Sequence, residues 1–184
     1  MLIILEGIDC SGKAVIGELI LKNLPGCFFM KHGSKPKDSS DAEILGLKNT
    51  YNIMYHIYAD FLEAQNKHLL VDRFYPSELV YSKPMRGYEA SDDPYYRIFE
   101  TEIQNANHRT VIIYVYATPE ILAGRMLERG DDFIKADQIP LILDRYAGFI
   151  NNTQLEVIPI RNELTLEEMT CQIKEQLIPQ LQEF

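Results

Sequence analysis

The sequence has few cysteines and no long apolar run. Its three cysteines, Cys10, Cys27 and Cys171, are widely spaced and form no Cys-x-x-Cys pair, so we expect neither a disulfide framework nor a zinc site. The longest strongly apolar run covers residues 110–117, far fewer than the roughly 20 residues of a membrane span. No basic region follows Met1. We therefore expect a cytoplasmic protein that is neither secreted nor membrane-spanning.

Basic residues are also scarce. The chain has 18 Lys and Arg against 27 Asp and Glu, a formal net charge of −9. Long nucleic acids are bound by basic surfaces, so we expect no such partner, and any anionic ligand would have to be held locally. The 184 residues, 46% of them hydrophobic, fit one domain with one core.

Short apolar segments alternate with segments of helical periodicity along the chain. We expect strands at 2–5, 27–30, 69–71, 110–116 and 155–160, with the first of them central in the sheet. We expect helices at 13–24, 41–67, 95–105, from 119 onward, and at 165–181. This order predicts a doubly wound α/β domain, with a mostly parallel five-stranded sheet and helices on both faces.

A glycine loop lies between the first strand and the first helix. Residues 7–14 read Gly-Ile-Asp-Cys-Ser-Gly-Lys-Ala, which matches the phosphate-binding pattern G-x-x-x-x-G-K-[ST] except at its last position. The glycines let backbone N–H groups turn around a phosphate, the helix N-terminus adds positive potential, and the lysine bridges the outer phosphates. The residues expected around a polyphosphate are Gly7, Asp9, Cys10, Ser11, Gly12, Lys13 and Ala14.

Ala14 stands where the pattern has a Ser or Thr whose hydroxyl ligates Mg²⁺. A water can fill this position, because Mg²⁺ commonly keeps several waters. If the lost ligand is worth about 1.5–3 kcal/mol, turnover falls roughly ten- to a few hundred-fold while phosphate binding survives. Asp72 ends the third strand and can hold the water shell of the metal, or merely cap a turn. Arg73 can clamp a second phosphate, or form a surface ion pair.

Four segments in order resemble the thymidylate kinase family of nucleoside monophosphate kinases, most closely its phage-type relatives. The segments are the glycine loop, Asp72-Arg73-Phe74 with Ser77 and Tyr81, residues 114–126, and residues 125–131. The resemblance implies one P-loop kinase domain over residues 1–184, with a short helical lid at about 124–137. It also implies that Asp9 approaches the sugar hydroxyl of the acceptor, that Arg73 holds its monophosphate, and that Tyr81 favours deoxyribose.

The resemblance also covers two arginines of the expected lid and one position beside the base. Arg125 and Arg129 lie four residues apart on one helical face and can reach the transferring phosphate as the lid closes; the alternative is a solvated face. Ser82 replaces the glutamine that reads thymine in many members, which leaves the base open. The aromatic residues that could stack on a base are Tyr51, Tyr55 and Phe74, although tyrosines at helical spacing are more often core.

The leading hypothesis is an ATP- and Mg²⁺-dependent kinase that phosphorylates a deoxypyrimidine nucleoside monophosphate, dTMP or a dUMP-type analogue. Its expected catalytic residues are Lys13, Asp72 (through water to the metal), Arg73, Arg125 and Arg129. One alternative is a nucleotide-binding protein with weak or no catalysis, because of Ala14. Another is a kinase acting on a nucleoside or a modified base. Homodimers are common in the resembled family, so a homodimer through residues 41–67 is an option.

Overall fold

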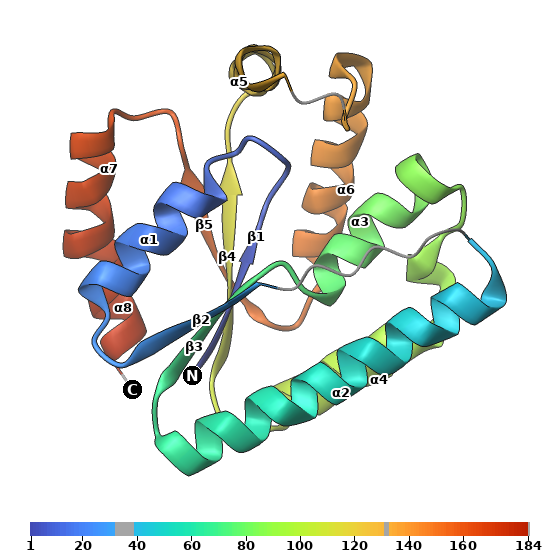
Figure 1. Ribbon diagram of the computed structural model, residues 1–184, viewed down its shortest axis with the longest axis horizontal. Helices are drawn as coiled ribbons and strands as arrows, with labels where there is room; N and C mark the ends of the chain where they lie inside the picture. The colour runs from blue at the N-terminus through green and yellow to red at the C-terminus, as the bar shows by residue number, and fades with distance from the viewer. Residues whose placement is uncertain (32–38, 131–132, 184) are drawn as a thin grey trace.

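The computed structural model describes residues 1–31, 39–130 and 133–183, which form a three-layer α/β fold (Figure 1). Its five strands are β1 (Leu2–Glu6), β2 (Cys27–Lys31), β3 (His68–Asp72), β4 (Thr110–Tyr116) and β5 (Glu156–Arg161). Each pair of neighbouring strands is parallel, in the order β2-β3-β1-β4-β5. The doubly wound fold, the five strands and the central position of β1 are therefore confirmed.

Helices cover both faces of this sheet. Figure 1 shows α1, α7 and α8 on one face and α2, α3, α4 and α6 on the other, with α5 beyond the carboxyl end of β4. The α-helices are α1 (Lys13–Asn23), α2 (Asp41–Gln65), α3 (Tyr75–Arg86), α4 (Pro94–Gln104), α5 (Pro119–Arg129), α6 (Ile139–Asn152), α7 (Leu166–Gln172) and α8 (Ile178–Gln182). Shorter turns are η1 (Ala90–Asp92), η2 (Ala136–Gln138) and η3 (Ile173–Leu177). In the described ranges, none of the helices has the length and hydrophobicity that crossing a membrane requires.

Side chains of β1 alternate between two hydrophobic cores. Leu2 and Ile4 belong to the core under α2, α3, α4 and α6. Ile3 and Leu5 belong to the core under α1, α7 and α8. All four are at most 1% exposed, which explains why the segment is continuously apolar rather than alternating. The buried strand holds the glycine loop that follows it on a rigid support.

Two helices were not expected from the sequence. Proline stands in the first turn of both, Pro76 in α3 and Pro140 in α6, where the missing N–H has no intrahelical partner to lose. α3 also holds Pro84 near its end, and these prolines hide the helical pattern. α6 does carry the signal of a helix, because it buries Ile139, Ile142, Tyr146 and Phe149 at helical spacing.

The C-terminal helix differs from the expected continuous helix at 165–181. The π-helical turn η3 separates α7 from α8. Pro179 lies in the first turn of α8, and its ring cannot donate a hydrogen bond to the preceding turn. A wider turn before the proline accommodates this loss. The expected start is confirmed, because Thr165 and Glu168 form a capping box.

Candidate active site

The glycine loop joins β1 to α1 at the carboxyl edge of the sheet. Gly7 has φ 148° and Gly12 has φ 94°, and both lie in backbone conformations that favour glycine. A Cβ on Gly7 would lie 2.1 Å from the carbonyl oxygen of Val115, and one on Gly12 would lie 1.9 Å from Nδ2 of Asn162. The two glycines are therefore required by space as well as by backbone conformation.

A residue from the far edge of the sheet holds the loop in place. Asn162, directly after β5, donates from Nδ2 to the carbonyl of Ser11 at 2.7 Å. Arg125 of α5 donates to the carbonyl of Asn162 at 2.9 Å and to that of Cys10 at 3.5 Å. Arg125 thus lies against the glycine loop, and its expected contact with phosphate stays a prediction. Sequence reasoning missed Asn162, and its place directly after the last strand was the available signal.

Arg129 lies one turn beyond Arg125, at the C-terminal end of α5, and is exposed. The structure does not bring it to the glycine loop, so its expected contact with phosphate stays a prediction. Residues 131 and 132 of the expected lid at 124–137 lie outside the described residues.

Lys13 is folded back into the loop. Its Nζ donates to the carbonyl of Gly7 at 2.8 Å and to that of Ile8 at 2.9 Å. Burial, followed by the nearby charge of Arg73, lowers the pKa of Lys13 to about 7, against the opposing effect of Asp9 and two further carboxylates. A bound phosphate would replace the two carbonyls and favour the charged ammonium.

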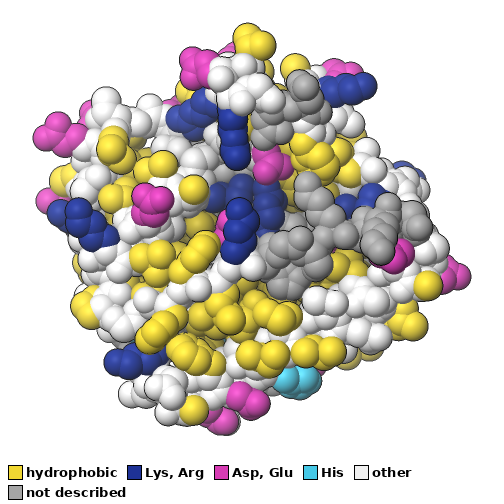
Figure 2. Space-filling view, viewed as in Figure 1, with side chains coloured by type: hydrophobic (Ala, Val, Ile, Leu, Met, Phe, Trp, Pro, Cys, Tyr) yellow, Lys and Arg dark blue, Asp and Glu magenta, His cyan; other side chains and the backbone are white. Residues whose placement is uncertain are grey.

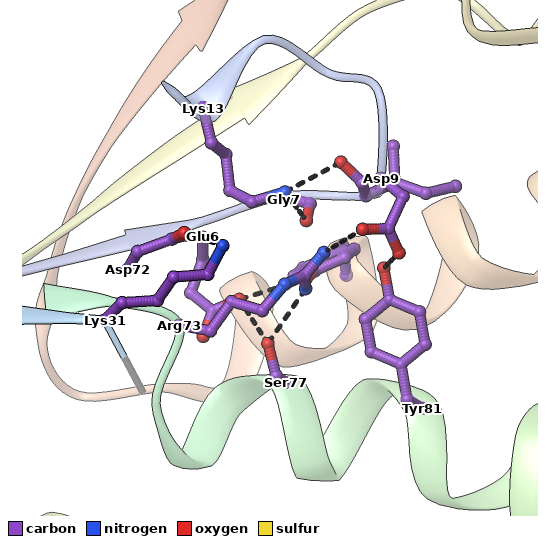
Figure 3. A network of polar contacts seen from close by, with 11 residues as sticks. Glu6, Gly7, Asp9, Lys13, Lys31, Asp72, Arg73, Ser77 and Tyr81 are labelled. Carbon is purple, nitrogen blue, oxygen red and sulfur yellow. Dashed lines mark hydrogen bonds and ion pairs between the residues drawn. The ribbon is translucent and has the colours of Figure 1, made fainter. Parts of the chain in front are cut away.

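Arg73 lies across the site from the loop (Figure 3). Its Nη2 pairs with Oδ1 of Asp9 at 2.9 Å, and its Nη1 donates to Ser77 Oγ at 3.1 Å. The guanidinium also lies over the ring of Tyr81, 5.2 Å from the centroid, and the hydroxyl of Tyr81 donates to Asp9 Oδ2 at 3.5 Å. The structure therefore brings Asp9, Arg73, Ser77 and Tyr81 together, and their expected roles toward an acceptor stay predictions.

Glu6, the last residue of β1, anchors the turn that carries Arg73. Its buried carboxylate accepts hydrogen bonds from the backbone N–H of Phe74 at 2.9 Å, from Ser77 Oγ at 2.8 Å and from Tyr146 Oη at 3.0 Å. Burial raises the pKa of Glu6, while Arg73 opposes the rise. Sequence reasoning missed Glu6 and Tyr146. A carboxylate at the end of an otherwise apolar strand was the available signal.

Asp72 ends β3 at the same edge. Its Oδ2 lies 3.9 Å from Nζ of Lys31, and its buried Oδ1 accepts no hydrogen bond from the described part of the chain. That unpartnered oxygen suits the water shell of a cation. Ala14 offers no second oxygen, and no cluster of three His, Cys, Asp or Glu is found among residues 1–31, 39–130 and 133–183. These donors fit Mg²⁺ held chiefly by nucleotide phosphates and water.

The three aromatic residues expected to stack on a base lie in the core instead. Phe74 is 1% exposed, and Tyr51 and Tyr55 are each 3% exposed. The ring of Tyr51 meets that of Phe74 edge-on at 5.4 Å, and the ring of Tyr55 meets that of Phe99 edge-on at 5.6 Å. Helical periodicity on α2 marked core residues, so the structure does not support a stacking role for these rings.

Basic side chains gather around this site although the whole chain is acidic. Figure 2 shows Lys and Arg side chains together near the centre of one face, beside the glycine loop end of the sheet. The contacts described above place four cations at this edge of the sheet: Lys13, Lys31, Arg73 and Arg125. The site can therefore hold anionic groups locally.

Comparisons with known proteins bear on the fold of the chain. No family model matches the chain. The SPbeta prophage-derived uncharacterized protein YorR of Bacillus subtilis (strain 168) is 26% identical over 154 residues, 84% of each protein. The crystal structure of YorR in complex with phosphorylated GDP superposes with a TM-score of 0.68, at 26% identity over 94% of this chain and 93% of that one.

Two kinases share the fold at lower identity. Deoxyadenosine kinase from M. mycoides with bound dATP has a TM-score of 0.59 at 16% identity, over 96% of this chain and 99% of that one. Thymidylate kinase from Candida albicans has a TM-score of 0.56 at 14% identity, over 98% of this chain and 91% of that one. The chain has the P-loop fold of nucleoside and nucleotide kinases.

Proposed function

We propose that the chain is an ATP-dependent kinase that phosphorylates a deoxypyrimidine nucleoside monophosphate, dTMP or a dUMP-type analogue. The observation that carries the proposal is the shared network of Lys13 and Arg73. The two cations come from different segments, and the charge of Arg73 acts on Lys13. Loop carbonyls hold Lys13, and Asp9 holds Arg73. One cation suits the phosphates of a donor and the other suits the phosphate of an acceptor.

Transfer then requires each cation to exchange its present partner for phosphate. Lys13 leaves the carbonyls of Gly7 and Ile8 and binds the outer phosphates of ATP. Arg73 turns from Asp9 to the acceptor monophosphate, and the released Asp9 carboxylate accepts a hydrogen bond from a sugar hydroxyl. Tyr81 fills the space beside the sugar. Phosphoryl transfer needs positioning and charge neutralisation rather than a covalent enzyme intermediate, and Mg²⁺ carried by the nucleotide adds charge neutralisation.

A second acceptor class is guanine nucleotides, because the YorR structure was solved with phosphorylated GDP. A coupled-kinase and thermal-shift screen separates the classes, using dTMP, dUMP, dCMP, 5-hydroxymethyl-dUMP, dGMP, ribonucleotides and unphosphorylated thymidine. We expect ADP production that depends on dTMP or dUMP. Turnover with dGMP alone would assign the guanine class. ATP binding without turnover at any Mg²⁺ concentration would favour the nucleotide-binding alternative.

ATP binding is expected to weaken as the pH rises above 7. The pKa of Lys13 is lowered to about 7 by burial in the ligand-free protein. ATP prefers the charged ammonium, so binding above pH 7 takes up a proton. We expect the affinity to fall roughly tenfold per unit between pH 8 and 9. Calorimetry in buffers of different ionisation enthalpy measures the proton uptake. A Lys13→Arg variant that binds ATP should show no such uptake, and uptake that persists there would assign it to another group.

Replacing Ala14 by threonine is expected to raise turnover at low Mg²⁺. The side chain is exposed at the first turn of α1, so a hydroxyl fits there. We expect a roughly ten- to hundred-fold gain in kcat below saturating metal, from a ligand worth about 1.5–3 kcal/mol. Val15→Thr places the same hydroxyl one residue away and is the control. Equal rates in all three proteins would show that the metal is held in another way.

A further inference from the structure

The site contains a cation that the phosphate-binding pattern does not include. Lys31 is the last residue of β2, and its backbone pairs in register with Asp72 of β3. Because both strands end at the carboxyl edge of the sheet, the register places Lys31 at the edge that carries the glycine loop, with β3 between β2 and β1. Figure 3 shows its side chain directed toward the side where Asp72, Lys13 and Arg73 gather.

The contact between Lys31 and Asp72 is loose. Nζ lies 3.9 Å from Oδ2, which is too long for a hydrogen bond. The Lys31 side chain is 73% exposed, whereas that of Asp72 is 16% exposed. An ion pair at this distance, with a mostly exposed lysine, contributes little to stability, so the ammonium can leave the carboxylate at small cost. Its four-carbon stem lets it move over several ångströms.

The glycine loop offers a metal ion one oxygen ligand fewer than the phosphate-binding pattern predicts. Ala14 presents a methyl group where such loops place a metal-binding hydroxyl. Asp72 is a carboxylate at this edge of the sheet, with one buried oxygen that accepts no hydrogen bond from the described residues. A loop with alanine at this position has one metal ligand fewer, and the exposed ammonium of Lys31 stands 3.9 Å from the carboxylate that would orient the water shell of the metal.

We propose that Lys31 is a phosphate-binding residue, whose ammonium moves from Asp72 to the phosphates of the bound nucleotide and offsets the ligand lost at Ala14. The inference rests on the proposed function, since it requires a nucleotide polyphosphate in the glycine loop. The inference goes beyond the proposed function by adding a residue that the loop pattern does not contain. Binding of the nucleotide then depends less on Mg²⁺ than in a loop with the hydroxyl.

Calorimetric titration with ATP, in EDTA and in saturating Mg²⁺, tests this assignment directly. We expect Lys31→Met to weaken metal-free binding roughly tenfold, the loss of one charged contact to phosphate. Lys31→Arg should keep most of the affinity. Lys22→Met, which removes an exposed lysine from the last turn of α1, should change it less than about twofold, because distant surface charges are screened by salt.

A double-mutant cycle with Ala14→Thr tests the compensation. In Mg²⁺, the loss caused by Lys31→Met should be smaller in the Ala14→Thr background than in wild type, because the restored hydroxyl holds the metal. Additive effects would overturn the compensation, and equal binding by Lys31→Met and Lys22→Met would overturn the phosphate contact. If wild type binds no ATP in either condition, the proposed function itself fails. Thermal melts of each variant confirm folding, since both lysines are exposed.

Discussion

Replacing Arg73 by methionine is expected to lower kcat/KM for the nucleoside monophosphate about 1,000-fold. The guanidinium pairs with Asp9 at 2.9 Å and contacts Ser77 at 3.1 Å, and the proposal assigns it to the acceptor phosphate. The donor site depends on the glycine loop instead. ATP affinity should therefore stay within a few-fold of wild type, so the loss falls on the acceptor alone.

Two further variants separate recognition from folding. Arg73→Lys keeps the charge but loses the two-pronged contact, and should recover part of the activity. Arg97→Met removes an exposed arginine from α4 and should leave both substrates unaffected. Steady-state kinetics with varied acceptor, together with calorimetric ATP binding, give the two readouts. Equal loss of ATP binding and acceptor use would show that Arg73 maintains the loop rather than the acceptor.

Much of the fold could be predicted because the three central strands, β3, β1 and β4, are buried on both faces. A continuously apolar segment such as 110–116 has few other structures available in a chain of this size. Helices were predictable where apolar residues recur every three to four positions without an internal proline. α3 and the C-terminal region contradict simple periodicity, since Pro76, Pro84 and Pro179 lie within helices. Where each of these helices begins depends on which turn its proline occupies. Tertiary packing decides which turn that is.

The candidate site was predictable where backbone geometry leaves a pattern and where the family resemblance carried over single residues such as Arg73 and Tyr81. The loop at 7–14 is recognisable because glycines are needed at positive φ. Glu6, Tyr146 and Asn162 reach the site through long-range contacts, such as the 3.0 Å hydrogen bond between Tyr146 and Glu6. Sheet order and helix packing create these contacts, and spacing along the chain does not record them. Lys31 became visible only through its register with Asp72.

Replacing Gly12 by alanine is expected to abolish measurable ATP binding and to destabilise the protein. The residue has φ 94°, which costs an L-residue about 1–2 kcal/mol. Its new Cβ would lie 1.9 Å from Nδ2 of Asn162, so the 2.7 Å hydrogen bond from Asn162 to Ser11 would break. A total of about 3 kcal/mol would lower Tm by roughly 6–12 °C in a chain of this length. Thermal melts and calorimetry measure both effects.

The chain offers a matched control and a rescue for this prediction. Gly124 lies inside α5, and a Cβ there meets nothing within 4 Å, so Gly124→Ala should stabilise the helix by about 0.5–1 kcal/mol. Combining Gly12→Ala with Asn162→Ala removes the steric clash while the φ strain remains. The double variant should therefore melt above Gly12→Ala alone. Wild-type ATP affinity in Gly12→Ala would show that these backbone amides do not form the phosphate site, because the loop cannot keep its conformation with that side chain present.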